Sequence, residues 1–101
     1  MLLPKAAVDK IILKLCAIEE LRARSTPADR RWLMALDSVI NSLNPEMRRL
    51  VSMHFFENRT GLEVMEALCI ERSTFYVWRE QILLQFAVAA AESGALQVFY
   101  D

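Results

Sequence analysis

A short stretch in the second half of the sequence brings together side chains that can bind phosphates and nucleobases. Arg72, Ser73 and Thr74 follow one another, and Tyr76 comes two residues later. An arginine can form two hydrogen bonds to a guanine edge or a phosphate, hydroxyl groups and helix N-terminal amides can hold phosphate oxygens, and a tyrosine ring can lie against a sugar or a thymine methyl group. These residue types suit contacts with a nucleic acid, provided that they share an exposed surface.

A helix must position these side chains, and its 100° turn per residue predicts which of them face outward. Phe75 begins an apolar stripe, and Ser73 lies on the opposite side of the helix. The residues predicted to be buried are Phe75, Trp78, Ile82, Phe86 and Ala89. The residues predicted to face solvent or to flank the stripe are Arg72, Ser73, Thr74, Tyr76, Val77 and Glu80.

The same stretch also fits a structural role. Glu71 or Ser73 could accept hydrogen bonds from the first backbone amides and thereby cap the helix. The stretch alone leaves both interpretations open.

Other common chemistries lack the residues that they require. Cys16, Cys69 and the single histidine, His54, do not form a zinc-binding pattern, so we expect two reduced, buried thiols and a partly buried structural histidine. No carboxylate stands at a spacing from His54 that suggests a catalytic triad, and two glycines cannot build a GxxxxGK phosphate loop. We therefore expect no enzyme activity, no metal and no cofactor.

Length and hydropathy predict one cytoplasmic domain. A chain of 101 residues can form a single hydrophobic core. No uncharged apolar run approaches the roughly 20 residues needed to span a bilayer, and the first residues do not resemble a secretion signal.

Apolar periodicity and capping signals predict an all-α fold with five helices. The expected ranges are about 4–22, 26–43, 45–56, 61–68 and 71–92. Thr26 and Asn44 precede prolines as N-caps, and Thr60 with Glu63 forms a capping box. We divide the chain into an N-terminal helical pair for packing or oligomerisation (1–43), a helix-turn-helix (44–93) and a tail (94–101).

A capped short helix, a turn of about four residues and a longer helix match the layout of a helix-turn-helix. The run from LNPEMRRLV through TGLEV to FYVWREQIL, residues 43–83, resembles sigma-70 region 4 and, more closely, phage late-transcription regulators of the ArpU and RinA type. Cys69 stands where many such motifs have glycine. The resemblance implies sequence-specific DNA binding by a phage-type transcriptional regulator of late genes, located in the bacterial cytoplasm or nucleoid. The expected DNA-binding residues are Arg59, Thr60, Arg72, Ser73, Thr74, Tyr76, Val77, Arg79 and Glu80.

The resemblance makes double-stranded DNA the expected partner, with RNA polymerase and a second copy of the chain as further candidates and no membrane contact. Two alternatives remain open. The first is a helix-turn-helix-shaped module that binds a polymerase or regulator without binding DNA. The second is a DNA-packaging protein similar to a small terminase subunit, which ring-like assembly would favour.

The charge distribution gives DNA binding little support. Residues 44–101 hold five arginines and eight acidic residues, a net charge of −3, whereas residues 1–43 have a net charge of +2. The position of each charge matters more than the total, and the five arginines of the second half could converge on one side.

The basic N-terminal half could also meet an acidic partner, and the apolar far end of the last helix could be a dimer seam. Met34, Met47, Met53 and Met65 are expected to fill the core.

Overall fold

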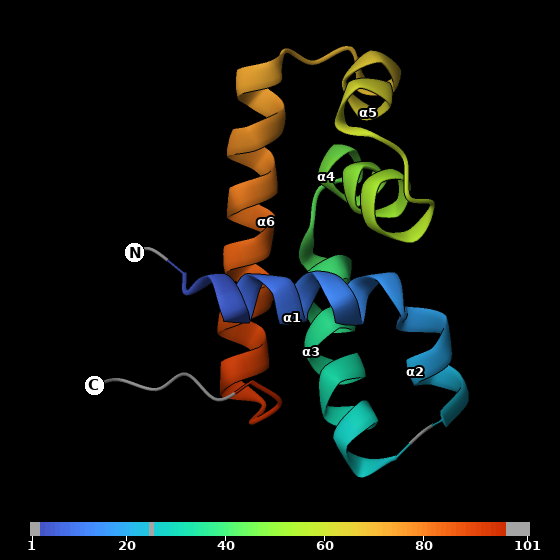
Figure 1. Cartoon of the computed structure of the whole chain (residues 1–101), viewed down its shortest axis with the longest axis vertical. Coiled ribbons are helices and arrows are strands. Elements are labelled where there is room, and N and C mark those ends of the chain that lie inside the picture. Colours follow the sequence, from blue (N-terminus) through green and yellow to red (C-terminus); the bar gives the residue numbers. More distant parts are fainter. Residues whose placement is uncertain (1–2, 25, 97–101) are drawn as a thin grey trace.

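The computed structural model describes residues 3–24 and 26–96. These residues form an all-helical fold in which short loops connect the helices (Figure 1). These residues contain no strand, as the periodicity predicted. The elements are α1 (Lys5–Cys16), α2 (Ile18–Arg24), α3 (Pro27–Ser42), α4 (Pro45–Val51), the π-helix η1 (Ser52–Phe56), α5 (Gly61–Leu68) and α6 (Arg72–Glu92).

The starts of α3 and α4 follow from their capping residues. The Thr26 hydroxyl accepts a hydrogen bond from the Asp29 amide at 3.1 Å, and the Asn44 side chain accepts one from the Met47 amide at 2.8 Å. A proline follows each cap, in the first turn, where the missing amide hydrogen costs no helical hydrogen bond. Both predicted N-caps are confirmed.

The prediction of one helix over residues 4–22 is wrong, because the chain bends at Ala17. Ala17 has φ −102° and ψ 18°, and it separates α1 from α2. The bend lets Ile18 and Leu21 of α2 be buried while α2 packs on α3. Residues 3–24 and 26–96 therefore form six α-helices, not the expected five.

The predicted helix over residues 45–56 is α-helical only as far as Val51, and it continues from Ser52 as a π-helix. Its last turn is the π-helix η1, in which the Glu57 amide donates to the Ser52 carbonyl at 2.9 Å. The wider turn buries Met53 and Phe55, whereas Phe56 stays 37% exposed. Such π turns arise where tertiary packing changes the register of an α-helix.

The two longest helices, α3 and α6, form the frame of the fold. They pack against each other, and α1 crosses them and contacts both α6 and η1 (Figure 1). α4, η1 and α5 lie beside the N-terminal half of α6, at the upper end of Figure 1. The first turns of α6 therefore lie at the end of the fold where this smaller group of helices packs.

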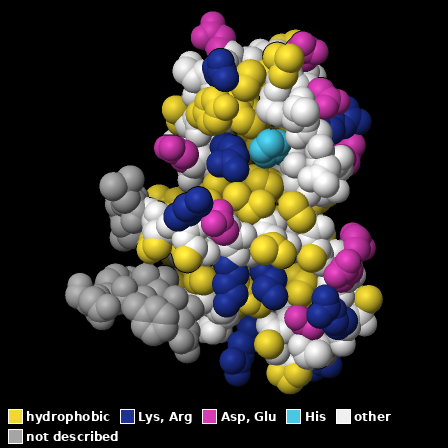
Figure 2. Space-filling model, in the orientation of Figure 1, with side chains coloured by type: hydrophobic (Ala, Val, Ile, Leu, Met, Phe, Trp, Pro, Cys, Tyr) yellow, Lys and Arg dark blue, Asp and Glu magenta, His cyan; other side chains and the backbone are white. Residues whose placement is uncertain are grey.

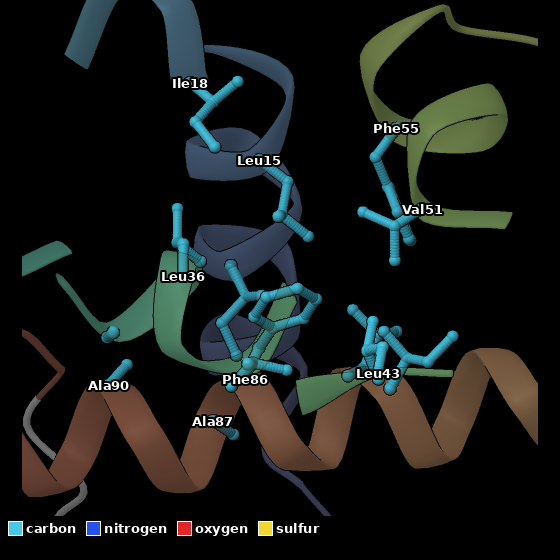
Figure 3. Packing of buried hydrophobic residues seen from close by; sticks show 14 of the residues in the cluster. Leu15, Ile18, Leu36, Leu43, Val51, Phe55, Phe86, Ala87 and Ala90 are labelled. Carbon is cyan, nitrogen blue, oxygen red and sulfur yellow. The ribbon is translucent and has the colours of Figure 1, made fainter. Parts of the chain in front are cut away.

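One hydrophobic core joins the N-terminal helices to the rest of the chain. Side chains from α1, α3, α4, η1 and α6 point toward a shared centre in Figure 3. Phe86, Leu15, Leu36 and Val51 have no measurable exposure. This burial is the main stabilising contribution to the fold, and it holds α6 in place.

Several expected burials are wrong. Cys16 and Cys69 are both free and exposed, because Cys16 ends α1 on its solvent side and Cys69 occupies the tight turn after α5. Met34 is 72% exposed and does not fill the core, whereas Met53 is buried.

Two further features concern the ends and the hydropathy of the chain. The expected tail, 94–101, is described only to Leu96, which is buried, and the remainder lies outside the described residues. Within residues 3–24 and 26–96, no helix combines the length and the apolar character needed to cross a membrane.

Candidate nucleic-acid interface

The start of α5 is fixed by the predicted capping box. The Glu63 amide donates to the Thr60 hydroxyl at 3.2 Å, and the Thr60 amide donates to the Glu63 carboxylate at 3.2 Å. The Thr60 hydroxyl also donates to this carboxylate at 3.1 Å. The hydrogen bond from the Thr60 amide, followed by that from its hydroxyl, lowers the pKa of Glu63 below its ordinary value of 4.5. The amide and the hydroxyl group of Thr60 are therefore both engaged in capping α5.

A tight turn connects α5 to α6. The amides of Cys69 and Ile70 donate to the carbonyls of Glu66 and Met65, at 3.3 and 3.0 Å, which is the hydrogen-bonding pattern of a Schellman motif. Cys69 has φ 54° and ψ 46°, in the left-handed region where glycine is the usual residue. The turn thus ends α5 within one residue and directs the chain into α6.

The first two turns of α6 divide into a buried and an exposed side, as the helical spacing predicted. Phe75 is 2% exposed, whereas Tyr76 is 48% and Val77 is 52% exposed. Thr74 and Trp78 are half-buried, so Trp78 packs less completely than expected. Further exposed residues on these turns are Arg72, Ser73 and Glu80.

Phe75 fixes this orientation because it contacts two other elements. Its ring meets the His54 ring of η1 edge to face, with 5.3 Å between centroids, and it lies against Gly61 of α5. His54 is half-buried, as expected, and its Nδ1 donates to the Arg59 carbonyl at 2.9 Å. The α5–α6 pair and the preceding loop are thereby held as one unit.

The N-terminus of α6 lacks the side-chain cap that a purely structural role predicts. Glu71 is the N-cap residue, but its side chain accepts no hydrogen bond from the helix amides, and Ser73 forms no such bond among the described residues either. Of the two interpretations that the sequence left open, the one in which Glu71 or Ser73 caps this helix is not supported. The first amides of α6 are therefore available to a hydrogen-bond acceptor outside the chain.

The five arginines of residues 44–101, which could have converged on one side, lie in two separate groups. Arg72 and Arg79 lie seven residues apart on one side of α6. Arg72 lies over the Tyr76 ring at 6.0 Å, and Arg79 is half-buried over the Phe55 ring at 5.8 Å. The other three arginines lie in a groove to which α6 contributes no residue.

Arg48, Arg49 and Arg59 line a groove that the sequence pattern did not predict. We call it the arginine groove; it has a volume of about 560 Å³ and runs across α4, η1, the following loop and α5. Its residues are Pro45, Arg48, Arg49, Ser52, Met53, Glu57, Arg59 and Ala67. The adjacent arginines of α4 were the only local signal for it. Arg59, one of the expected DNA-binding residues, lies here and is paired with Glu57 at 3.1 Å.

The distribution of charge around the α6 surface is mixed. On the face seen in Figure 2, Lys and Arg side chains and Asp and Glu side chains are both spread from the upper to the lower end. The upper end is formed by α5 and the first turns of α6 (Figure 1). A partner of this end must therefore be held by specific contacts more than by a general positive potential.

No group of three or more metal-binding side chains occurs among the described residues. The exposed side chains at the start of α6 offer charge, hydrogen bonding and apolar contact.

Comparisons with known proteins place the chain in a family. No curated protein and no solved structure gives a significant match. The family model named DUF1492, which is described as a protein of unknown function, matches residues 4–86, and this range includes α1 and the first turns of α6. Because the match covers most of the sequence, the chain belongs to the DUF1492 family.

Proposed function

We propose that the protein is a sequence-specific DNA-binding transcriptional regulator of the phage type, acting on late gene expression. One observation carries the proposal. The first two turns of α6 expose Arg72, Ser73, Tyr76 and Val77, while Phe75 holds the opposite side of the helix in the core. The proposal assigns the protein a binding role and no catalytic one.

The order of the elements supports a helix-turn-helix. α5 is eight residues long, the Schellman turn at Cys69 follows, and α6 then runs for 21 residues. In a helix-turn-helix the second helix lies in the major groove, and its N-terminal residues contact base edges. The exposed side chains of α6 belong to this part of the helix, and the uncapped amides at its start can hold a phosphate oxygen.

Each exposed residue suits a contact of its own in the major groove. Arg72 can bind guanine or a phosphate, and Glu80 can accept a hydrogen bond from a cytosine amino group. Tyr76 and Val77 can pack on sugars or thymine methyl groups. Arg79 stacks on Phe55 and lies further along the helix, so we assign it a supporting contact with the DNA backbone.

Selection of binding sites from a random duplex library tests the proposal. The purified protein should enrich one sequence motif at near-physiological salt, where purely ionic binding is weak. An inverted pair of half-sites would further indicate a symmetric dimer. Failure of a folded protein to enrich any motif would overturn the proposal.

Arg72→Ala tests the assignment of the DNA-binding side. The variant should lose about 1–3 kcal/mol of affinity for the selected site and keep its melting temperature. Arg31→Ala is the matched control, because Arg31 is also an exposed arginine on a helix but lies on α3. Equal affinities of the two variants would mean that the assigned side of α6 is wrong.

A second function, binding of a protein partner without DNA, is favoured by an apolar groove beside the same helix. The groove has a volume of about 470 Å³, and its apolar lining comes from Leu3, Val8, Val77, Leu83 and Leu84. Arg79, Glu80 and Gln81 of α6 also line it. A partner helix or strand that covered Val77 would bury exposed apolar surface. Crosslinking from position 77 to RNA polymerase, combined with no enriched DNA motif, would favour this function over the first.

A further inference from the structure

The arginine groove is chemically distinct from the α6 surface. Three arginines and one glutamate line it, so its charged side chains sum to +2 in a chain whose net charge is −1. α6 contributes no residue to it. Met65 lies on the side of α5 that packs near Phe75. Ala67 comes two residues later, so it lies about 200° around the helix from Met65, on the opposite side. The groove is thus a separate site on the other side of α5.

Two of its guanidinium groups are held in place by the protein. Arg48 donates through Nε to the Ile40 carbonyl at 3.1 Å and through Nη2 to the Leu43 carbonyl at 3.1 Å, which fixes it against the end of α3. Arg59 donates through Nε and Nη2 to one oxygen of Glu57, at 3.2 and 3.1 Å. In both residues Nη1 makes no such bond among the described residues, so it can donate to a ligand in the groove.

The third arginine and a hydroxyl group have no partner within the described part of the chain. Arg49 is exposed, and it forms no hydrogen bond or ion pair with any described residue. Ser52 is half-buried in η1, and its hydroxyl likewise has no described partner. The groove therefore combines two prearranged cations, one unpaired cation and one free hydroxyl group.

We propose that the arginine groove binds a phosphate group. A phosphate offers several oxygens in different directions, which suits donors that approach from three guanidinium groups and a hydroxyl, and its negative charge matches the excess charge of the groove. The phosphate can belong to a nucleic-acid backbone or to a free phosphate compound. This inference goes beyond the proposed function of α6 and does not depend on it.

The first experiment is an NMR titration of the ¹⁵N-labelled protein with inorganic phosphate, at constant pH and with ionic strength kept constant by sodium chloride. The backbone amides of Arg49, Ser52 and Arg59 should shift and reach saturation. Arg49→Ala should weaken phosphate binding by roughly tenfold, because a hydrogen bond to a charged group is lost. Its fold should be unaffected, since Arg49 has no described partner, and Arg31→Ala should bind phosphate as the unchanged protein does.

Two results would overturn the proposal. One is a linear, unsaturated response that sodium chloride reproduces, and the other is equal phosphate binding by Arg49→Ala and the unchanged protein. Saturable binding of a glutamate-rich peptide, with no phosphate binding, would also overturn it and would assign the groove to an acidic protein segment.

A second measurement distinguishes the two sources of phosphate. Binding to a random-sequence DNA duplex is followed over a range of salt concentrations. If the ligand is a DNA backbone phosphate, Arg49→Ala should reduce the slope of log K against log salt by about 1. Phosphate binding with an unchanged slope would support a free phosphate compound as the ligand. Either result can occur whether or not the library selection enriches a motif, so the two proposals can fail separately.

Discussion

Phe75 lies so close to Gly61 that a Cβ atom at residue 61 would be 3.3 Å from the ring carbon Cε2. The ring cannot easily move away, because it is 2% exposed and also packs edge to face with the His54 ring. The missing side chain at residue 61 therefore sets how closely α5 approaches α6. This approach determines how the exposed residues of α6 are presented relative to α5.

Gly61→Val should destabilise the protein by about 1–3 kcal/mol, because the added carbon atoms would meet the buried Phe75 ring. Urea unfolding followed by circular dichroism measures the change. The control is Leu62→Ala at the neighbouring residue, which is 65% exposed and should change stability little. Equal stability of Gly61→Val and the unchanged protein would show that the two helices can separate without cost.

Cys69→Gly should stabilise the protein by about 0.5–1 kcal/mol. A left-handed backbone costs a residue with a side chain roughly 1–2 kcal/mol, and the greater freedom of glycine in the unfolded chain offsets part of the gain. The midpoint of urea unfolding gives the measurement. Cys16→Gly is the matched control, because Cys16 is also exposed but ends an α-helix, where glycine should be destabilising. A loss of stability in Cys69→Gly would contradict the role of the turn conformation.

Arg48→Ala should lower stability by about 1–2 kcal/mol, because the arginine donates to the carbonyls of Ile40, Asn41 and Leu43 and thereby caps the end of α3 from α4. Thermal unfolding at neutral pH measures the effect. The adjacent Arg49→Ala should have almost no effect, since Arg49 has no described partner. Identical melting temperatures for the two variants would rule out a capping role for Arg48.

The capping box should make the stability of the folded protein depend on pH in the acidic range. Because folding lowers the pKa of Glu63, the ionised carboxylate stabilises the folded state above pH 4.5, and this contribution is lost as the pH falls through the lower pKa of the folded protein. Glu63→Gln keeps a capping side chain but cannot titrate. The melting temperature of the unchanged protein, measured relative to this variant, should therefore fall as the pH decreases below 4.5.

Glu66→Gln is the control for that comparison, because Glu66 lies in the same helix but its carboxylate makes no described contact. A difference between Glu63→Gln and the unchanged protein that stays constant from neutral pH to pH 3 would exclude the predicted role of Glu63.

Local signals in the sequence determined the helical class, the starts of three helices and the two sides of α6. Thr26, Asn44 and the Thr60–Glu63 pair act within a few residues of their own position, so their effect can be read without the rest of the fold. The burial of Phe75 opposite Ser73 follows from helical spacing, which is also local.

Only the tertiary structure decided the features that depend on distant packing. The bend at Ala17 and the π turn at Ser52 exist because neighbouring helices must bury side chains on both sides of each point. The arginines separate into two groups because α5 lies between the arginine groove and α6, and Arg48 reaches α3 across the turn before its own helix. Sequence spacing specifies the side of one helix on which a residue lies, but the distance between residues of different helices is set by how those helices pack.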